Sequence, residues 1–85
     1  MTKPQVKEKL IKIVVKQLSP KDGVEITDAT HFVNDLQADS LDSVELAMEI
    51  GDAFDIELPD DDVSKLQTVG ATIDYVFNAL IKKRG

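Results

Sequence analysis

The sequence predicts an all-α protein, a four-helix bundle of three longer helices and one short one, in a single domain over residues 1–85. Three observations lead to this prediction. Apolar residues recur at helical spacing in three long stretches, and no stretch alternates long enough for a strand. A chain of 85 residues is also too short for two hydrophobic cores, and we find neither an internal repeat nor a linker.

The first helix is expected at about residues 3–18. Pro4 suits a first helical turn, because its missing N–H is not needed there. The predicted inward stripe consists of Val6, Leu10, Ile13, Val14 and Leu18. Ser19 and Pro20 should end the helix.

The next segment, residues 19–39, shows no sustained period and is longer than an ordinary loop, so apolar side chains should pin it to the core. The predicted pins are Val24, Ile26, Phe32, Val33 and Leu36. His31 is interpreted as a loop residue. It has no second histidine as a metal partner, and no serine elbow for which it would act as a base.

The second helix, at about residues 40–54, carries two apolar stripes. One consists of Leu46, Ile50 and Phe54, and the other of Leu41, Val44 and Met48. A small soluble protein needs one stripe for its own core, so the second indicates deeper burial or a docking surface. Asp42, Glu45 and Asp52 beside the second stripe favour docking.

The start of this helix needs a cap, and either Asp39 or Ser40 can provide it. Asp42 lies favourably in the first turn, near the positive end of the helix dipole. Spacing alone favours the interpretation that Ser40 is only an N-cap.

Pro59 and the three aspartates after it predict a short helix through Val63 and Leu66. Thr68 is a suitable cap for a last helix at about residues 68–83. The inward stripe there should be Val69, Ile73, Val76, Phe77 and Leu80. Lys82, Lys83 and Arg84 lie where the C-terminus of a helix prefers cations.

Charge and composition narrow the functional classes. The formal net charge is −6, and every acidic residue except Glu8 and Asp74 lies between Asp22 and Asp62, a stretch without lysine or arginine. This field repels nucleic acid and favours partner proteins with basic patches. Because the chain has no cysteine and no acidic run with EF-hand spacing, we expect no metal site and no enzymatic activity. The absence of a membrane span or signal segment predicts a cytoplasmic protein, which we expect to be a monomer.

Several motifs together resemble a known family. Asp39-Ser40-Leu41, then Glu45-Leu46, Met48, Phe54-Asp55, Pro59 and Ile73-Asp74-Tyr75-Val76 resemble the acyl carrier proteins of bacterial-type, dissociated (type II) fatty acid synthesis. The likeness runs from about Val6 to Ile81. It implies that a phosphopantetheinyl transferase attaches 4′-phosphopantetheine from coenzyme A to Ser40. The arm would supply the thiol that this chain lacks, and it would carry growing acyl chains as thioesters.

The resemblance also implies a partner face on the second helix. Asp39, Asp42, Glu45 and Asp52 would meet basic grooves of fatty acid synthesis enzymes, and Leu41, Val44 and Met48 would supply the apolar contact. The chain departs from the family at four positions. Gln37 stands where glycine is usual, Gly51 and Ala53 replace acidic residues, and Glu49 stands where a small or apolar residue is common.

Two alternative functions stay open. One is a carrier of the same fold for a specialised pathway, such as polyketide or lipid A synthesis. The other belongs to a different class: an acidic helical interaction module in which Ser40 is only a cap and carries no arm. For either carrier, we expect the bundle to shield an acyl chain, since Ala47 and Ala53 leave room on the second helix.

Overall fold

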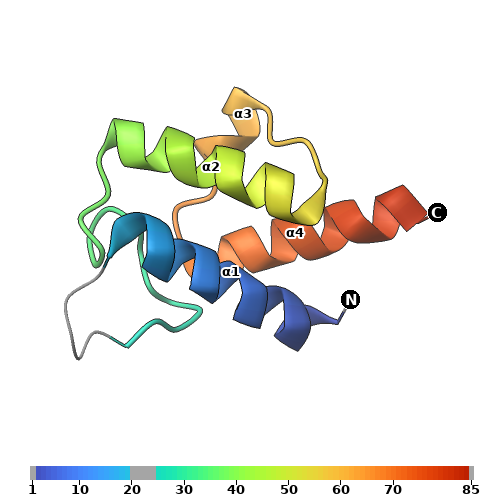
Figure 1. Ribbon diagram of the computed structural model, residues 1–85, viewed down its shortest axis with the longest axis horizontal. Coiled ribbons are helices and arrows are strands. Elements are labelled where there is room, and N and C mark those ends of the chain that lie inside the picture. Colours follow the sequence, from blue (N-terminus) through green and yellow to red (C-terminus); the bar gives the residue numbers. More distant parts are fainter. Residues whose placement is uncertain (1, 20–24, 85) are drawn as a thin grey trace.

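The computed structural model describes residues 2–19 and 25–84 and confirms the predicted all-α bundle. The helices are α1 (Lys3–Leu18), α2 (Ser40–Phe54), α3 (Asp60–Val63) and α4 (Val69–Arg84). Figure 1 shows α1 running in the opposite direction to α2 and α4, with the short α3 beside α2. The described residues form no strand, and His31 and Thr68 make an isolated bridge. None of the helices in this part of the chain is both long enough and apolar enough to cross a membrane.

The core forms where α1, α2 and α4 meet, and it also takes in part of the segment before α2. Its apolar members are Val6, Leu10, Val14, Phe32, Leu36, Ala38, Leu46, Ile50, Phe54, Val69, Ile73 and Val76. Ile13, Leu18, Phe77 and Leu80 are partly buried against it. The inward stripes predicted for the first and last helices are therefore confirmed.

Both ends of α1 are capped, the start by side chains and the end by a residue in the left-handed conformation. Thr2 and Gln5 form a capping box in which Thr2 N donates to Gln5 Oε1 at 2.8 Å and Gln5 N donates to Thr2 Oγ1 at 3.4 Å. Pro4 lies in the first turn, as predicted. Ser19 adopts a left-handed conformation (φ 45°) that ends the helix.

The connection between α1 and α2 is fixed by some of the predicted apolar pins and not by others. Phe32 and Leu36 are buried and Ile26 is partly buried against the core, but Val33 is 52% exposed. Asp35 N donates to the carbonyl of His31, so this segment turns like a helix. Phe32 and Leu36, four residues apart, therefore share an inward face, and Val33 points away from it. The prediction for Val33 was wrong, and Val24 lies outside the described residues.

Backbone hydrogen bonds fasten the same connection to the start of α4. Val69 N donates to Thr30 O at 2.9 Å, and Gly70 N donates to Asp28 O at 2.8 Å. A Cβ on residue 70 would lie 2.9 Å from that Asp28 oxygen, so only glycine permits the approach without a shift. These contacts place the loop beside the beginning of α4.

The short helix ends at Val63, three residues earlier than predicted. The N–H groups of Lys65 and Leu66 donate to the carbonyls of Asp62 and Val63, each at 3.0 Å and three residues back, so the chain continues in tight turns. Thr68 then caps α4 as predicted, because its Oγ1 accepts from Ala71 N at 3.1 Å.

Candidate functional site

The first turn of α2 is capped by two carboxylates. Asp39 Oδ1 accepts from Asp42 N at 2.8 Å, and Asp42 Oδ2 accepts from Asp39 N at 3.2 Å, which makes a reciprocal capping box. Ser40 is the first residue of the helix and is exposed. The cap uses no atom of its side chain, so the capping role that spacing favoured for Ser40 belongs to Asp39.

The two apolar stripes of α2 lie on different faces with opposite exposure. Leu46, Ile50 and Phe54 are only 3–5% exposed. Leu41 and Met48 are each 65% exposed, and Val44 is 53% exposed. The second stripe is therefore not deeper burial, and a continuous apolar strip lies open on the surface.

Acidic residues lie around this open strip, at the positions the sequence predicted. Asp39, Glu45 and Asp52 are exposed and Asp42 is half-buried. Glu45 Oε2 accepts a hydrogen bond from Gln17 Nε2 of α1 at 3.0 Å. The ion pairs found among the described side chains lie elsewhere, at Lys3–Asp74, Lys7–Asp28, Lys12–Glu8 and Lys83–Asp55.

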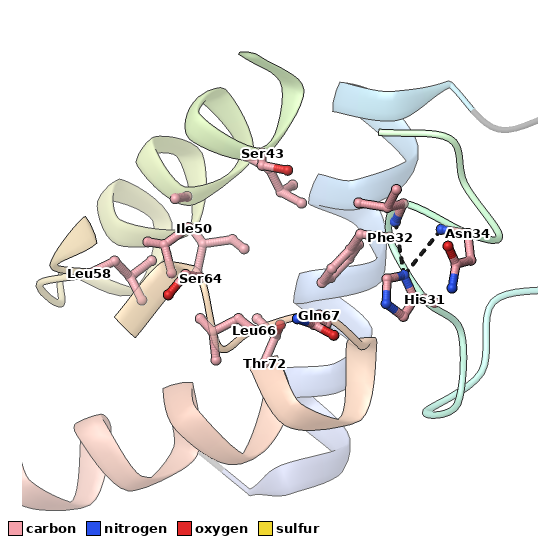
Figure 2. A pocket seen from close by; sticks show the side chains of 14 residues that line it. His31, Phe32, Asn34, Ser43, Ile50, Leu58, Ser64, Leu66, Gln67 and Thr72 are labelled. Carbon is pink, nitrogen blue, oxygen red and sulfur yellow. Dashed lines mark hydrogen bonds between the residues drawn. The ribbon is translucent and has the colours of Figure 1, made fainter. Parts of the chain in front are cut away.

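A cavity of about 370 Å³ lies between α2, the loop around Phe32, the segment through α3, and α4. Figure 2 shows Ser43 and Ile50 of α2 facing it, opposite Leu66 and Thr72. Ser43 follows Ser40 by about one helical turn, so the cavity lies close to the exposed serine along the helix. Ala47 lines the cavity as expected, whereas Ala53 packs against the core instead.

His31 shapes the loop wall of this cavity. Its Nδ1 accepts from the backbone N–H groups of Val33 at 3.2 Å and Asn34 at 3.1 Å (Figure 2). The backbone N–H of His31 donates to Asp35 Oδ2 at 2.7 Å. These bonds agree with the loop role predicted for His31.

A second cavity, of about 260 Å³, lies on the exposed face between α2 and α3. Its lining includes Val44, Met48, Gly51 and Ile56. Ile56 lies two residues after the end of α2. A Cβ on Gly51 would lie 3.1 Å from the carbonyl oxygen of Ile56. Alanine would therefore recover less than the helix-propensity difference of about 1 kcal/mol that an open helix position allows.

The backbone conformation of Gln37 gives a structural reason for the glycine that is usual at this position in the family that the sequence resembles. Its φ is 57°, in the left-handed region that favours glycine. Gln37 N donates to Val33 O at 3.0 Å and closes the turn that leads into α2.

Sequence reasoning missed one contact near the first cavity. Tyr75 Oη of α4 donates to Asp62 Oδ2 of α3 at 2.8 Å, in a partly buried position. Burial raises the pKa of Tyr75, and the hydrogen bond to Asp62 and the negative charges of Asp62 and Glu57 raise this pKa further. The two residues are far apart along the chain, so no spacing rule connects them. The signal available was that a half-buried tyrosine hydroxyl needs a partner.

Comparisons with known proteins agree with this geometry. Residues 8–76 match the family described as "Phosphopantetheine attachment site". The structure superimposes on the acyl carrier protein of Enterococcus faecalis with a TM-score of 0.75 and 36% identity, over 93% of this chain and 99% of that one. The chain belongs to the acyl carrier protein family. A protein of Anaplasma phagocytophilum described as an acyl carrier protein is also similar, with a TM-score of 0.81, 29% identity and 89% of both chains covered.

Membership of the acyl carrier protein family confirms several predictions at once. The four-helix fold is that of these solved structures. The matched domain is an attachment site for phosphopantetheine, which confirms the predicted prosthetic group. Acyl carrier proteins are carriers and not enzymes, and a phosphopantetheine carrier implies acyl chains and enzymes as partners.

Proposed function

We propose that this protein carries growing fatty acyl chains as thioesters on a 4′-phosphopantetheine arm attached to Ser40, and presents them to the enzymes of fatty acid synthesis. The observation that supports this proposal best is the state of the Ser40 side chain. It is exposed at the first residue of α2, while Asp39 and Asp42 satisfy the helix start without it.

The chemistry asked of Ser40 is modest. A transferase would bring coenzyme A, magnesium and a base. The base would take the proton of Ser40 Oγ while this oxygen forms a bond to the phosphorus on the pantetheine side, and the pyrophosphate bond of coenzyme A would break to release its adenosine bisphosphate half. Ser40 is then a substrate and needs only to be reachable. The thiol at the far end of the arm would hold the acyl group, since the chain contains no cysteine.

The cavity beside α2 supports a shielding role. Of the residues that line it, none is an aspartate, glutamate, lysine or arginine, so an alkyl chain would meet mostly apolar side chains. At about 0.8 kcal/mol per buried methylene, an eight-carbon chain gains up to roughly 5 or 6 kcal/mol before ordering costs. The apolar side chains of this lining support fatty acyl cargo, whereas a polyketide would also need its oxygen atoms to reach the polar side chains among them, such as Ser43 and Thr72.

The open strip of α2 supports recognition by basic partner enzymes. Leu41, Val44 and Met48 offer apolar contact, and Asp39, Asp42, Glu45 and Asp52 offer negative charge around it. An interface of this size and charge should form fast, depend on salt and release easily, which suits a carrier that visits several enzymes in turn.

Attachment is tested by intact-mass measurement after incubation with coenzyme A and a phosphopantetheinyl transferase. We expect the unmodified wild-type chain to gain the mass of one 4′-phosphopantetheine group, and Ser40→Ala to gain none. Ser43→Ala is the matched control, because Ser43 lies one turn further along α2 but faces the cavity. A wild-type chain that gains no mass would contradict the proposal and favour an interaction module. A Ser40→Ala chain that still gains the mass would contradict Ser40 as the attachment site.

The cargo is tested separately with protein already loaded at Ser40. Octanoyl loading should raise the melting temperature and slow amide exchange in the core, while a polyketide chain of equal length should do so less. Equal effects of the two cargoes would favour a specialised carrier. No effect of either one would exclude shielding.

A further inference from the structure

We propose that Tyr75 and Asp62 form a latch between α4 and α3 that limits the length of acyl chain the cavity accepts. This inference rests on the proposed function, in which the cavity shields the chain. The latch is the hydrogen bond from Tyr75 Oη to Asp62 Oδ2, 2.8 Å long and partly buried.

Among the groups of α3 that the structure describes, the other hydrogen bonds are local. Asp62 N and Val63 N both donate to Pro59 O, and Ser64 Oγ donates to Asp61 O at 2.8 Å. Bonds of this kind move with the segment, so α3 can shift as a unit without breaking them. The bond to Tyr75, in contrast, crosses to another helix and must break if α3 moves away from α4.

The same segment forms one wall of the cavity. Val63, Ser64 and Leu66 follow Asp62 directly and line the cavity, and Thr72 lines it from α4, one turn before Tyr75. The latch therefore ties two walls of the cavity together. The α2 wall is fixed, because Leu46 and Ile50 belong to the buried core. A chain too long for the present volume must push the α3 wall outward.

The chemistry of the pair suits a latch that holds at neutral pH and still releases. A phenol that donates to a carboxylate makes a stronger bond than two neutral groups do. The bond is nevertheless single and near the surface, so an acyl chain that gains buried area can outweigh it. Short chains should leave the bond intact, and long chains should open it.

The test uses protein loaded at Ser40 with butanoyl, octanoyl or dodecanoyl chains, in wild-type and Tyr75→Phe forms. Amide exchange across residues 61–66 reports the opening of α3. In wild type we expect this exchange to rise only with the longest chain. In Tyr75→Phe it should already be faster, on the order of tenfold, with the two shorter chains, because one hydrogen bond to a charged group no longer resists opening. It should rise little further with dodecanoyl, which opens the bond in wild type. The gain in melting temperature on dodecanoyl loading should also be larger in this variant.

Two further variants separate the latch from a general stability effect. Asp62→Asn keeps an acceptor oxygen but loses the charge, so its exchange should lie between wild type and Tyr75→Phe, whereas Asp62→Leu should behave like Tyr75→Phe. Lys83→Met removes a different tie between α4 and the end of α2, at Asp55, and should leave the dependence on chain length unchanged.

Each remaining outcome overturns the inference in a distinguishable way. If Tyr75→Phe lowers the melting temperature of all loaded and unloaded forms equally, and the exchange keeps the wild-type dependence on chain length, the bond is structural and no latch exists. If wild-type protein shows no stabilisation at any length, the shielding part of the proposed function fails, and the latch fails with it.

Discussion

The two faces of α2 have similar side chains and opposite surroundings. Leu46 and Ile50 meet α1 and α4 in the core, while Val44 and Met48, within the same helical turns, lie on the surface among carboxylates. The difference teaches that helical periodicity alone does not assign a function to a stripe. What decides is what lies across from the stripe: packed helices on one side and, on the other, exposed surface with the short α3 at its edge.

The largest expected effect comes from truncating one side chain on each face of α2 and comparing the losses of stability. Ile50→Ala should lower the free energy of unfolding by about 2 to 5 kcal/mol, because it leaves a cavity in the core. Met48→Ala should change it by no more than about 0.5 kcal/mol, since the side chain is exposed. Urea unfolding of both variants measures the difference. Similar losses would mean that the exposed stripe also holds the fold together.

Charge reversal on the exposed face should affect partners and leave the fold intact. We expect Glu45→Lys to weaken turnover by a fatty acid synthase enzyme several-fold at low salt, and less at high salt, where the attraction is screened. The matched control is Glu8→Lys, an exposed site on α1 with the same change in charge. If Glu45→Lys keeps its turnover, or if the control loses turnover equally, the exposed face of α2 is not the surface that partner enzymes recognise.

The turn that leads into α2 belongs to neither face. A substitution there tests the effect of backbone conformation on stability, separately from either apolar stripe. Gln37→Gly should raise the free energy of unfolding by about 1 kcal/mol, because a left-handed conformation costs non-glycine residues about 1 to 2 kcal/mol and glycine loses more entropy on folding. Equilibrium denaturation measures this gain. Loading at Ser40 should stay the same, and a destabilised Gln37→Gly protein would show that the side chain makes contacts that outweigh the strain.

The smallest effect concerns the end of α2. Lys83 Nζ pairs with the Asp55 carboxylate and donates to the Asp55 carbonyl at 2.7 Å, and its hydrogen bond and charge lower the pKa of Asp55 below 3.8. A lowered pKa contributes stability that is present above about pH 4 and is lost as the pH falls through the folded value. Lys83→Met should therefore melt slightly below wild type at pH 7 and show a smaller difference at pH 2. A difference that does not change with pH would contradict this origin.

Local rules predicted the parts of the molecule that local chemistry determines. The inward stripes of α1 and α4, the cap at Thr68 and the two faces of α2 followed from spacing and residue type. The candidate serine did not, because a serine beside an aspartate at a helix start fits a cap equally well. Its proposed role came from the resemblance, and the structure added that Asp39 and Asp42 leave Ser40 out of the cap.

What the sequence missed depends on a turn within the loop and on contacts between distant segments. The exposure of Val33 followed from a helical turn within the loop, and the fastening of that loop depends on backbone bonds to α4. The bond between Tyr75 and Asp62 likewise joins two helices through side chains that no period relates. Such pairs become visible only when the packing of the helices is known.

The central claim is that α2 divides its work, with cargo on the cavity side and partner enzymes on the exposed side, joined at Ser40. Per-residue amide NMR shifts test it most directly, first on octanoyl loading and then on titration with a basic fatty acid synthesis enzyme. We expect loading to shift residues along the cavity, such as Leu46, Leu66 and Thr72, and the enzyme to shift Leu41, Val44 and Met48. If the acyl chain and the enzyme perturb the same set of residues, the division of α2 into two working faces is wrong.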